Sequence, residues 1–356
     1  ARSKERGKLV IEENLEENDV VISSRIRLAR NIADYPFIST CSDDQRSQIE
    51  ITLRSGIGEV DRLSDVSIVN SVELEALERQ FLLDLNLVRS GSVPMESDTA
   101  DSPEETSVEE VGVTINEEDH LRIQVLQPGL NFGKVWKRVD ALDSNIESEV
   151  SYAYDGDLGF LTACPTNLGT GMRASVMMHL PGLVMSKNMD KVVNAVNQLG
   201  FAVRGLFGEG SDASGSIFQI SNQQTLGESE SAIIERLDKT LQNLVRQEEF
   251  ARKKLLQDDG RRLIDKISRA IGSLKSCHLI QSAEAMDLLS LIRLAADFKM
   301  LPESYRSTAD RMFIEIQPGH VQLAAGKPVE PDDRDYLRAS LLRQKFSKAP
   351  FIKTDG

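Results

Sequence analysis

The sequence contains few of the residues on which metal-binding and disulfide-stabilised proteins depend. Its 356 residues include three cysteines (Cys41, Cys164 and Cys277) and four histidines, and no two cysteines form a CxxC pair. We therefore expect neither a disulfide framework nor a metal held by protein side chains, and we expect a reducing, cytoplasmic location. No apolar run reaches the roughly 18 residues that a membrane-spanning helix needs, so no membrane anchor is expected.

Positive charge is also scarce, because 42 Lys and Arg face 56 Asp and Glu for a formal net charge of −14. Non-specific binding to nucleic acid requires cationic side chains that neutralise phosphates, so direct nucleic-acid binding is not expected. An acidic surface instead favours basic protein partners. The length fits two domains, and 40% hydrophobic residues suffice for a sizeable core.

Strand and helix patterns are mixed up to Gly227. Apolar segments predict strands at 20–23, 111–115, 121–126, 160–163, 174–180, 201–206 and 216–221. Helical spacing predicts helices within 43–60, 74–87, 131–146 and 190–199. Short loops between strand pairs favour a mainly antiparallel sheet with helices packed on it, which is an α+β fold.

After Gly227 the sequence predicts helices only, at 229–257, 260–272, 283–298 and 332–346. We therefore expect a catalytic domain over 1–227 and a small all-α domain over 228–356. Within the first domain, residues 91–110 contain seven acidic and no basic side chains. This composition predicts a mobile acidic surface loop, and a solvated charge run without a role is the plain interpretation.

Two segments combine arginines with strand ends or turns. In 23–27 (SSRIR), Arg25 and Arg27 stand two residues apart, so they project from the same face of a strand. Such a pair suits a polyphosphate because each guanidinium binds oxygens bidentately, and a salt-bridged rim of the sheet is the alternative. In 203–212 (VRGLFGEGSD), Arg204 enters a glycine-rich turn, for which a plain hairpin loop is the alternative.

A third segment, 116–122 (NEEDHLR), places three consecutive acids between two predicted strands. Like charges at this density cost energy unless a cation or a substrate neutralises them. The segment therefore predicts a carboxylate cluster that grips a cationic substrate or acts as a general base. A solvated hairpin turn is the alternative.

The fourth segment, 164–176 (CPTNLGTGMRASV), joins a loop rich in glycine and threonine to Arg173. Exposed backbone N–H groups in such a loop predict an anion cradle, although the P-loop pattern is absent. Cys164 is either a small buried hydrophobe or, beside guanidinium groups, a thiol that tends toward thiolate. Together the four segments supply arginines for a polyphosphate and carboxylates for a cationic acceptor, as a kinase that acts on a guanidinium requires.

The four segments resemble the phosphagen (guanidino) kinases, such as arginine and creatine kinase, over about 20–226. The resemblance implies an eight-stranded antiparallel sheet flanked by helices, with ATP bound and Mg²⁺ held through its phosphates. It implies Glu118 as the base that deprotonates the guanidinium, Cys164 beside the acceptor nitrogen, and Glu117 and Asp212 as further substrate carboxylates. The ATP-binding residues implied are Ser23, Ser24, Arg25, Ile26, Arg27, Asn86, Arg122, Arg173, Ala174, Ser175, Val176, Met177, Arg204, Gly205, Leu206, Phe207, Gly208 and Glu209.

The sequence differs from the phosphagen kinases in its domain order and at two site residues, and these differences point to one branch of the family. Phosphagen kinases carry a helical domain before the first arginine-bearing strand, whereas here 22 residues precede Ser23 and the helical unit follows the catalytic domain. Asn86 stands where these kinases often have a nucleotide-contacting His, and Phe207 stands where arginine kinases have a phosphate-binding Arg. The layout is similar to the bacterial protein-arginine kinases of the McsB type.

The helical tail also contains a segment that is similar to the protein-arginine kinases, namely 334–339 (RDYLRA). It matches the RDxxRA motif of the family's allosteric phosphoarginine pocket, which implies a site formed by Arg334, Asp335, Arg338 and Ala339. Arginines four residues apart share one face of a helix and suit a phosphate. An ordinary surface helix rich in Arg and Asp is the alternative.

The resemblance implies transfer of the γ-phosphoryl group of ATP to arginine residues of proteins, to mark them for Clp degradation or to regulate a stress-response repressor. It implies a homodimer through the helical tail, with a Clp unfoldase/protease, a heat-shock repressor and a zinc-finger activator as partners. A small-molecule arginine kinase is one alternative, which the lack of an N-terminal lid disfavours. A catalytically inactive phosphoarginine-binding adaptor is the other, which Glu118 and the phosphate-binding arginines disfavour.

Overall fold

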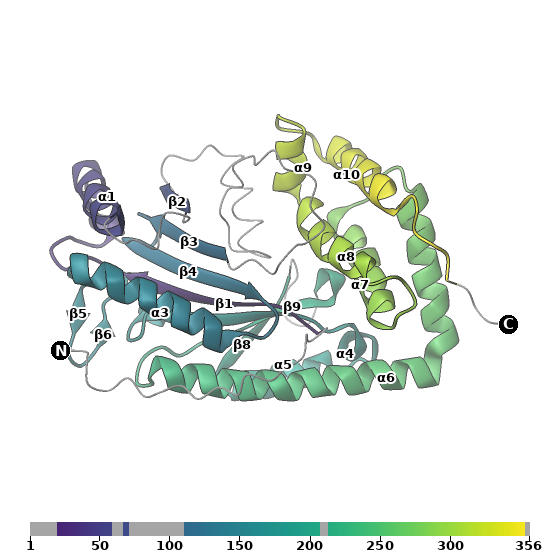
Figure 1. Cartoon of the computed structure of the whole chain (residues 1–356), viewed down its shortest axis with the longest axis horizontal. Coiled ribbons are helices and arrows are strands. Elements are labelled where there is room, and N and C mark those ends of the chain that lie inside the picture. Colours follow the sequence, from purple (N-terminus) through teal and green to yellow (C-terminus); the bar gives the residue numbers. More distant parts are fainter. Residues whose placement is uncertain (1–19, 59–66, 71–109, 207–212, 353–356) are drawn as a thin grey trace.

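The computed structural model describes residues 20–58, 67–70, 110–206 and 213–352. A twisted sheet forms one half of the molecule and a group of helices the other, and one long helix runs along both (Figure 1). This architecture confirms the predicted α+β fold with helices flanking a largely antiparallel sheet. The predicted helix at 74–87, and the predicted acidic loop at 91–110 up to its last residue, lie outside the described residues.

The main sheet has seven strands in the order β2-β3-β4-β1-β7-β9-β8. They are β1 (Val21–Arg30), β2 (Ser67–Asn70), β3 (Glu110–Ile115), β4 (Leu121–Pro128), β7 (Met172–His179), β8 (Phe201–Gly205) and β9 (Ile217–Asn222). Neighbours are antiparallel except β2 and β3, which are parallel. The described sheet thus differs from the expected eight antiparallel strands. Parallel neighbours need a crossover of a dozen or more residues, and residues 71–109 provide that length.

A separate hairpin precedes the Cys164 segment and consists of β5 (Tyr154–Asp155) and β6 (Gly159–Phe160). The predicted strand at 160–163 is therefore wrong beyond its first residue. Thr162 Oγ1 donates to the carbonyl of Cys164 at 2.8 Å, and the amide of Ala163 donates to the Asp119 carboxylate at 2.7 Å. These backbone groups bond to side chains, so they are not available for a strand ladder.

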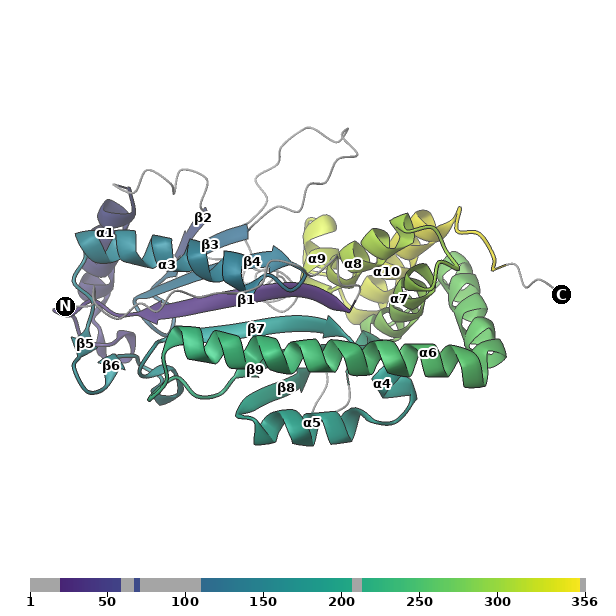
Figure 2. The same ribbon diagram turned by 60° about the horizontal axis from the view of Figure 1, so that its bottom comes forward.

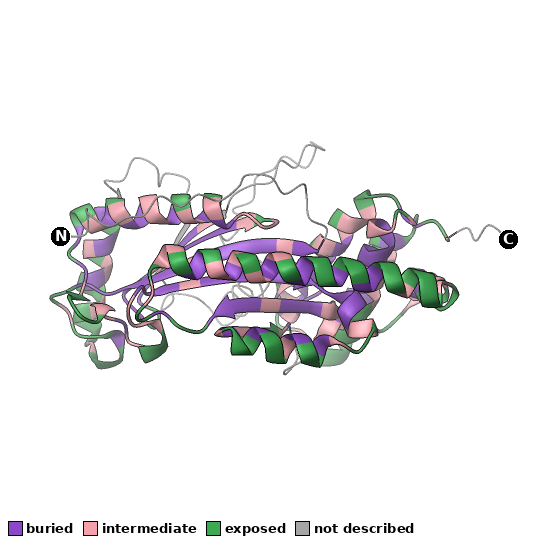
Figure 3. Cartoon of the chain, turned by 90° about the horizontal axis from the view of Figure 1, so that it is seen from below, coloured by how far each residue is buried: buried purple, intermediate pink, exposed green. Residues whose placement is uncertain are grey.

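One face of the main sheet is apolar and is covered by helices. Ile26 and Leu28 of β1 are fully buried, and the register places Ala174 of β7 opposite Ile26. The covering helices are α3 (Phe132–Glu149), α5 (Met189–Gln198) and α6 (Glu230–Ser276). α3 packs on β1 and β4, α5 on β8, and α6 on β7 and β9 (Figures 2 and 3). Val135 and Val139 show the four-residue spacing that gives α3 its apolar stripe.

The remaining helices lie on both sides of Gly227, and those after it include the helices predicted at 283–298 and 332–346. They are α1 (Asp43–Gly58), α4 (Pro181–Met185), α7 (Ser282–Asp297), α8 (Ser304–Glu315), α9 (Pro318–Ala324) and α10 (Pro331–Phe346), with 3₁₀ turns η1 (Ile38–Thr40), η2 (Pro165–Asn167) and η3 (Ser214–Ser216). The helices predicted at 229–257 and 260–272 correspond to the two parts of α6, which meet at a kink where Asp259 leaves the helical conformation (φ −131°, ψ 25°). Helices α8 and α9 are not among the predicted helices, although buried Ala309, Met312 and Phe313 of α8 have the spacing of an apolar stripe; α9 is only seven residues long.

Helix α6 contributes to two apolar cores. Its side chains up to Ala251 pack with the sheet, and those from Leu263 onward pack with α7, α8 and α10. Met177, Leu206 and Ile217 of the sheet region belong to the second core, so the helical unit packs directly on one end of the sheet.

In the ranges that the structure describes, no helix has both the length and the apolar character to cross a membrane. The domain border at 227/228 stays a prediction.

A buried polar network joins the end of β7 to the helical unit. His179 is fully buried; its Nε2 lies 2.7 Å from Ser290 Oγ, and Arg293 donates to its Nδ1 at 3.2 Å. Arg252 donates to the His179 carbonyl at 3.0 Å and to Asp297 at 2.8 Å. Burial, followed by the charges of the neighbouring arginines, lowers the pKa of His179 well below its ordinary value. His179 is therefore neutral in the folded protein.

Acidification is expected to destabilise the fold through His179. Its pKa is lower in the folded state than the value of about 6.5 in an unfolded chain, so below pH 6.5 the unfolded chain binds the proton first. The free energy of unfolding therefore decreases as the pH is lowered, by at most about 1.4 kcal/mol per pH unit for one histidine. In His179→Gln this group no longer titrates, so the decline between pH 7 and pH 5 is expected to be shallower. Denaturant titrations at both pH values measure the two slopes, and equal slopes contradict the expectation.

Candidate active site

Five arginines share the sheet face opposite the apolar one, and we call this the arginine face. Arg27 of β1 lies directly opposite Arg173 of β7, and Arg25 lies two residues along the same strand. The register also brings Arg122 of β4 and Arg204 of β8 to this face. The prediction that Arg25 and Arg27 project from one face is confirmed, and three further strands add to the cluster.

Burial and mutual repulsion destabilise the charges on the arginine face. Burial, followed by the charges of Arg173 and Arg122, lowers the pKa of Arg25 to about 10. Burial and the charges of Arg25, Arg122 and Arg173 lower the pKa of Arg27 well below its ordinary value. Guanidinium groups still keep their protons at neutral pH. A bound anion would therefore relieve a repulsion that the protein maintains in its absence.

Serine hydroxyl groups contact two of these arginines. Arg25 Nε donates to Ser175 Oγ at 3.4 Å, and Arg173 Nη2 donates to Ser221 Oγ at 3.0 Å. Nε of Arg173 is buried without a hydrogen-bond partner in the described part of the chain. Burial and the charge of Arg204 lower the pKa of Arg173. The Nε–H of Arg173 therefore remains available to an oxygen of a polyphosphate.

The other predicted ATP-binding residues of these strands alternate between the two faces. Ser24 belongs to the apolar side, where its Oγ donates to the Gly129 carbonyl at 2.6 Å and accepts from the Asn131 amide at 3.1 Å. By strand alternation the same side holds Ile26, Ala174, Val176 and Gly205. The side of the arginine face holds Ser23, Ser175, Met177 and Leu206.

The turn between β3 and β4 brings carboxylates to the arginine face. Glu117 forms an ion pair with Arg122, and its charge raises the pKa of Arg27. Glu118 is the next residue and is exposed. Asn116 opens the turn at φ 57°, a left-handed conformation that asparagine tolerates. Because Glu117 bonds to one of the arginines, this turn is part of the charged cluster and not a separate solvated hairpin.

Cys164 lies beside the same cluster. Its thiol is half-buried, with Sγ 3.0 Å from Thr166 Oγ1. An electrostatic interaction with Cys164 raises the pKa of Arg173, against the larger effect of burial. Cys164 is therefore neither a fully buried hydrophobe nor remote from the arginines.

The predicted anion cradle in the glycine-rich loop after Cys164 is wrong. The amides of Gly169, Thr170 and Gly171 donate to backbone carbonyls at 3.3, 2.9 and 3.0 Å, so they are not available to a ligand. Gly169 is required for close packing, because at φ 107° a Cβ there would lie 2.3 Å from the Thr225 carbonyl oxygen. The loop shapes the site without binding the anion through these amides.

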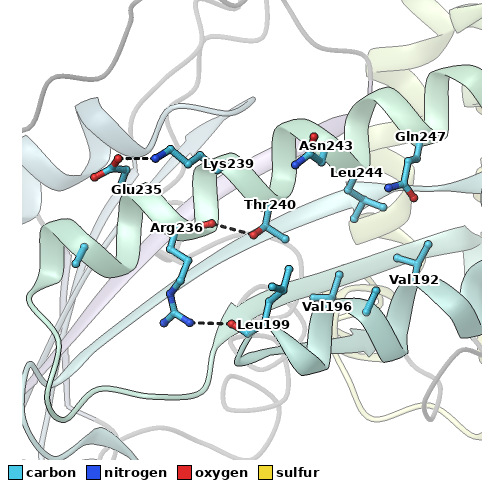
Figure 4. Close-up of a pocket in the computed structure, with 12 residues that line it drawn as sticks. Val192, Val196, Leu199, Glu235, Arg236, Lys239, Thr240, Asn243, Leu244 and Gln247 are labelled. Carbon is cyan, nitrogen blue, oxygen red and sulfur yellow. Dashed lines mark hydrogen bonds and ion pairs between the residues drawn. The ribbon is translucent and has the colours of Figure 1, made fainter.

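A further arginine and a cavity lie on the other side of the sheet. Arg30 of β1 forms an ion pair with Asp143 of α3 at 2.8 Å, and both side chains are buried. A cavity of about 660 Å³ opens between α5 and α6 and is lined by Val196 and Leu244 (Figure 4). None of the predicted site residues lines this cavity. The cavity is therefore not part of the predicted site.

Family models match both parts of the chain. Residues 50–251 match the ATP:guanido phosphotransferase C-terminal catalytic domain, and residues 260–355 match the protein-arginine kinase McsB C-terminal domain. A protein-arginine kinase of Bacillus cereus (strain B4264) is 40% identical over 332 residues, which is 93% of each chain. The chain belongs to the protein-arginine kinase family. A protein-arginine kinase of Bacillus anthracis (strain CDC 684 / NRRL 3495) is also 40% identical over 332 residues, again 93% of each chain.

Solved structures share the fold of this protein-arginine kinase family member. Lombricine kinase aligns with a TM-score of 0.50 and 24% identity, over 67% of this chain and 69% of that chain. The duplicated taurocyamine kinase of Schistosoma mansoni, with bound transition state analog components, aligns with a TM-score of 0.55 and 19% identity, over 80% of this chain and 46% of that chain. The fold is that of the phosphagen kinases, and the family's catalytic domain is a phosphotransferase.

Some family-derived site residues lie outside the described residues, namely Asn86, Phe207, Gly208, Glu209 and Asp212. Sequence reasoning also missed Ser221, although it contacts Arg173. No motif marks this serine; only the pairing of β7 with β9 places it opposite Ser175. The strand alternation of β9 is therefore the one signal that would have found it, once the strand order was known.

The RDxxRA segment lies on α10 in the helical unit. Arg338 is 2% exposed, and its guanidinium donates to the carbonyls of Ile316 and Ile280, both at 2.8 Å. Arg334 is only half-buried and donates to the Val329 carbonyl at 3.4 Å. Arg338 thus links α10 to two chain segments of the helical unit, whereas Arg334 faces partly outward.

Proposed function

We propose that this chain is an ATP-dependent protein-arginine kinase. The observation that carries the proposal is the arginine face, where five guanidinium groups from four strands lie beside the Glu117–Glu118 turn and Cys164. A cationic surface accommodates the triphosphate, and the neighbouring carboxylates accommodate a cationic acceptor. The proposal therefore accounts for both charge signs within one site.

In the proposed reaction a guanidinium nitrogen of the acceptor attacks the γ-phosphorus of ATP. The new N–P bond forms while the bond from phosphorus to the β–γ bridging oxygen breaks, and ADP leaves. Glu118 accepts the proton that the guanidinium nitrogen loses. Arg25, Arg27 and Arg173 stabilise the charge on the phosphate oxygens in the transition state. Cys164 and Glu117 help to hold the acceptor.

Magnesium accompanies ATP in this proposal. In the described ranges, no three His, Cys, Asp or Glu side chains come together as a metal site. The residues present therefore fit an ion that is carried mainly by the phosphate oxygens of ATP. When bound, Mg²⁺ neutralises phosphate charge, and the arginines supply the remainder.

We propose arginine residues of proteins, rather than free arginine, as the acceptor. The support is the 40% identity to relatives named protein-arginine kinase across 93% of the chain. Lombricine and taurocyamine kinases, which resemble this chain less closely, represent the alternative of a small-molecule guanidino kinase. The test measures ADP release with an unfolded arginine-bearing protein and with free L-arginine. We expect release with the protein only; release with free arginine alone overturns the choice of acceptor.

We further propose a regulatory and cellular setting for the kinase. Arg334, Asp335, Arg338 and Ala339 form a phosphoarginine-binding site in a helical domain over 228–356, which follows a catalytic domain over 1–227. The protein acts as a cytoplasmic homodimer in the bacterial stress response. It marks proteins for a Clp unfoldase/protease, regulates a heat-shock repressor and responds to a zinc-finger activator. The support for this setting is the match of residues 260–355 to the McsB C-terminal domain.

A further inference from the structure

A buried carboxylate next to Glu118 connects three parts of the candidate active site. Asp119 is 5% exposed, and its Oδ1 accepts hydrogen bonds from Asn31 Nδ2 at 2.6 Å and from the Ala163 amide at 2.7 Å. Asn31 directly follows β1, and Ala163 directly precedes Cys164. One oxygen atom therefore joins the strand of Arg25 and Arg27, the turn of Glu118 and the segment of Cys164.

Asn31 reinforces the same connection with its remaining atoms. Its Oδ1 accepts from the His120 amide at 2.9 Å, and its Nδ2 also donates to the Leu161 carbonyl at 3.0 Å. Asn31 is 2% exposed. The two side chains thus bond to each other and to both neighbouring segments, and we call this pair the Asp119–Asn31 clamp.

The imidazole of His120 fixes the end of the turn. Its Nδ1 accepts from the Ile32 amide at 2.9 Å, and its Nε2 lies 2.9 Å from the Pro36 carbonyl oxygen. The first bond requires an unprotonated Nδ1, so Nε2 carries the proton and donates to Pro36. Burial lowers the pKa of His120, which keeps the ring neutral. The turn is thus anchored on the residue that follows Asn31.

We propose that Asp119 is a positioning residue for phosphoryl transfer, which sets Glu118 and Cys164 relative to the arginine face. The inference rests on the proposed kinase function. Consecutive Cα atoms are 3.8 Å apart, so the bonds that fix Asp119 to Asn31 and Ala163 to Asp119 restrict Glu118 and Cys164 to narrow ranges. A displacement of about 1 Å at reacting groups can cost on the order of 100-fold in rate. The ATP-binding arginines are held by the sheet itself and do not depend on Asp119.

The test compares Asp119→Ala, which removes both acceptor bonds, with Asp119→Asn, which keeps an oxygen in place of Oδ1. We expect kcat for protein phosphorylation to fall about 100-fold in Asp119→Ala, with an unchanged ATP dissociation constant, and to recover largely in Asp119→Asn. Asp155→Ala is the matched control, because Asp155 Oδ1 also accepts two amides, from Asp157 and Leu158, but in the exposed β5–β6 turn. This control is expected to retain full activity.

A second readout does not require activity. Alkylation of Cys164 by iodoacetamide, followed by peptide mass spectrometry with Cys41 and Cys277 as internal references, is expected to be faster in Asp119→Ala. Wild-type kcat and an unchanged Cys164 alkylation rate in a folded Asp119→Ala overturn the inference, as does a loss of ATP affinity that parallels the loss of kcat. If Asp119→Ala does not fold, Asn31→Ala removes the same 2.6 Å bond from the other side and is expected to give the same result.

The two proposals fail in different ways. If the wild-type protein forms no phosphoarginine, the kinase function fails, and the change in Cys164 alkylation still tests the clamp. If the wild-type protein is active and Asp119→Ala is equally active with an unchanged rate of Cys164 alkylation, the clamp fails and the kinase function stands.

Discussion

Replacing Glu118 with glutamine is expected to lower the rate of phosphoarginine formation by about 100-fold or more while ATP still binds. A guanidinium has a pKa above 12 and must lose a proton to become a nucleophile. Glutamine keeps the size of the side chain but cannot accept that proton at neutral pH. Glu118 is exposed beside Glu117, which pairs with Arg122, so the substitution leaves the described contacts of the arginine face intact.

The measurement for Glu118→Gln combines a rate with an affinity. Phosphorylation of an arginine-bearing protein gives the rate, and fluorescence or calorimetric titration with Mg-ATP gives the dissociation constant. Glu149→Gln, at the exposed end of α3, is the matched control and is expected to behave as wild type. A normal rate in Glu118→Gln removes Glu118 from the mechanism. A loss of ATP binding in proportion to the rate assigns it to nucleotide binding instead.

Replacing Arg27 with methionine is expected to weaken ATP binding and at the same time to stabilise the nucleotide-free protein. Loss of one charge-assisted contact to phosphate costs about 2 kcal/mol, or roughly 30-fold in the dissociation constant. The stability effect has the opposite sign. The pKa of Arg27 is lowered by burial and by Arg25, Arg122 and Arg173, so its charge is less stable in the folded protein than in the unfolded chain.

Thermal unfolding with and without ATP measures both effects of Arg27→Met. The melting temperature without ATP is expected to rise, and the further rise on adding ATP is expected to shrink, because ligand stabilisation follows affinity. Arg269→Ala is the control: it removes an arginine that is 78% exposed and paired with Asp265 on α6. A melting temperature that falls without ATP, together with unchanged ATP affinity, would show that Arg27 is a structural residue like Arg30.

Local spacing in the sequence predicts the parts of the site that depend on one strand. The two-residue spacing of Arg25 and Arg27 predicts their common face, and the register confirms it. The same alternation separates Ser24 and Ile26 from them, which a contiguous motif does not reveal. The charged turn at 117–119 is likewise visible in the sequence, although the inward bonds of Asp119 are not.

The parts that sequence reasoning missed depend on contacts between distant segments. The glycine-rich loop composition predicts free amides, but the Thr225 carbonyl, far along the chain, accepts from Thr170. Arg338 has the spacing of a phosphate ligand, and its hydrogen bonds to the carbonyls of Ile316 and Ile280 come from distant segments that the motif does not reveal. The helix boundary that Gly260 marks by propensity is local in the sequence, and α6 does leave the helical conformation at the adjacent Asp259.

The central claim is tested most directly by following the γ-phosphate. The purified chain is incubated with Mg²⁺, γ-³²P-labelled ATP and an unfolded arginine-bearing protein, and the products are kept at neutral to alkaline pH because the P–N bond is acid-labile. The arginine face and Glu118 predict label on arginine side chains that is lost in acid and is absent with Glu118→Gln. Label found only on serine, threonine or tyrosine, or no label although ATP binds, contradicts the account.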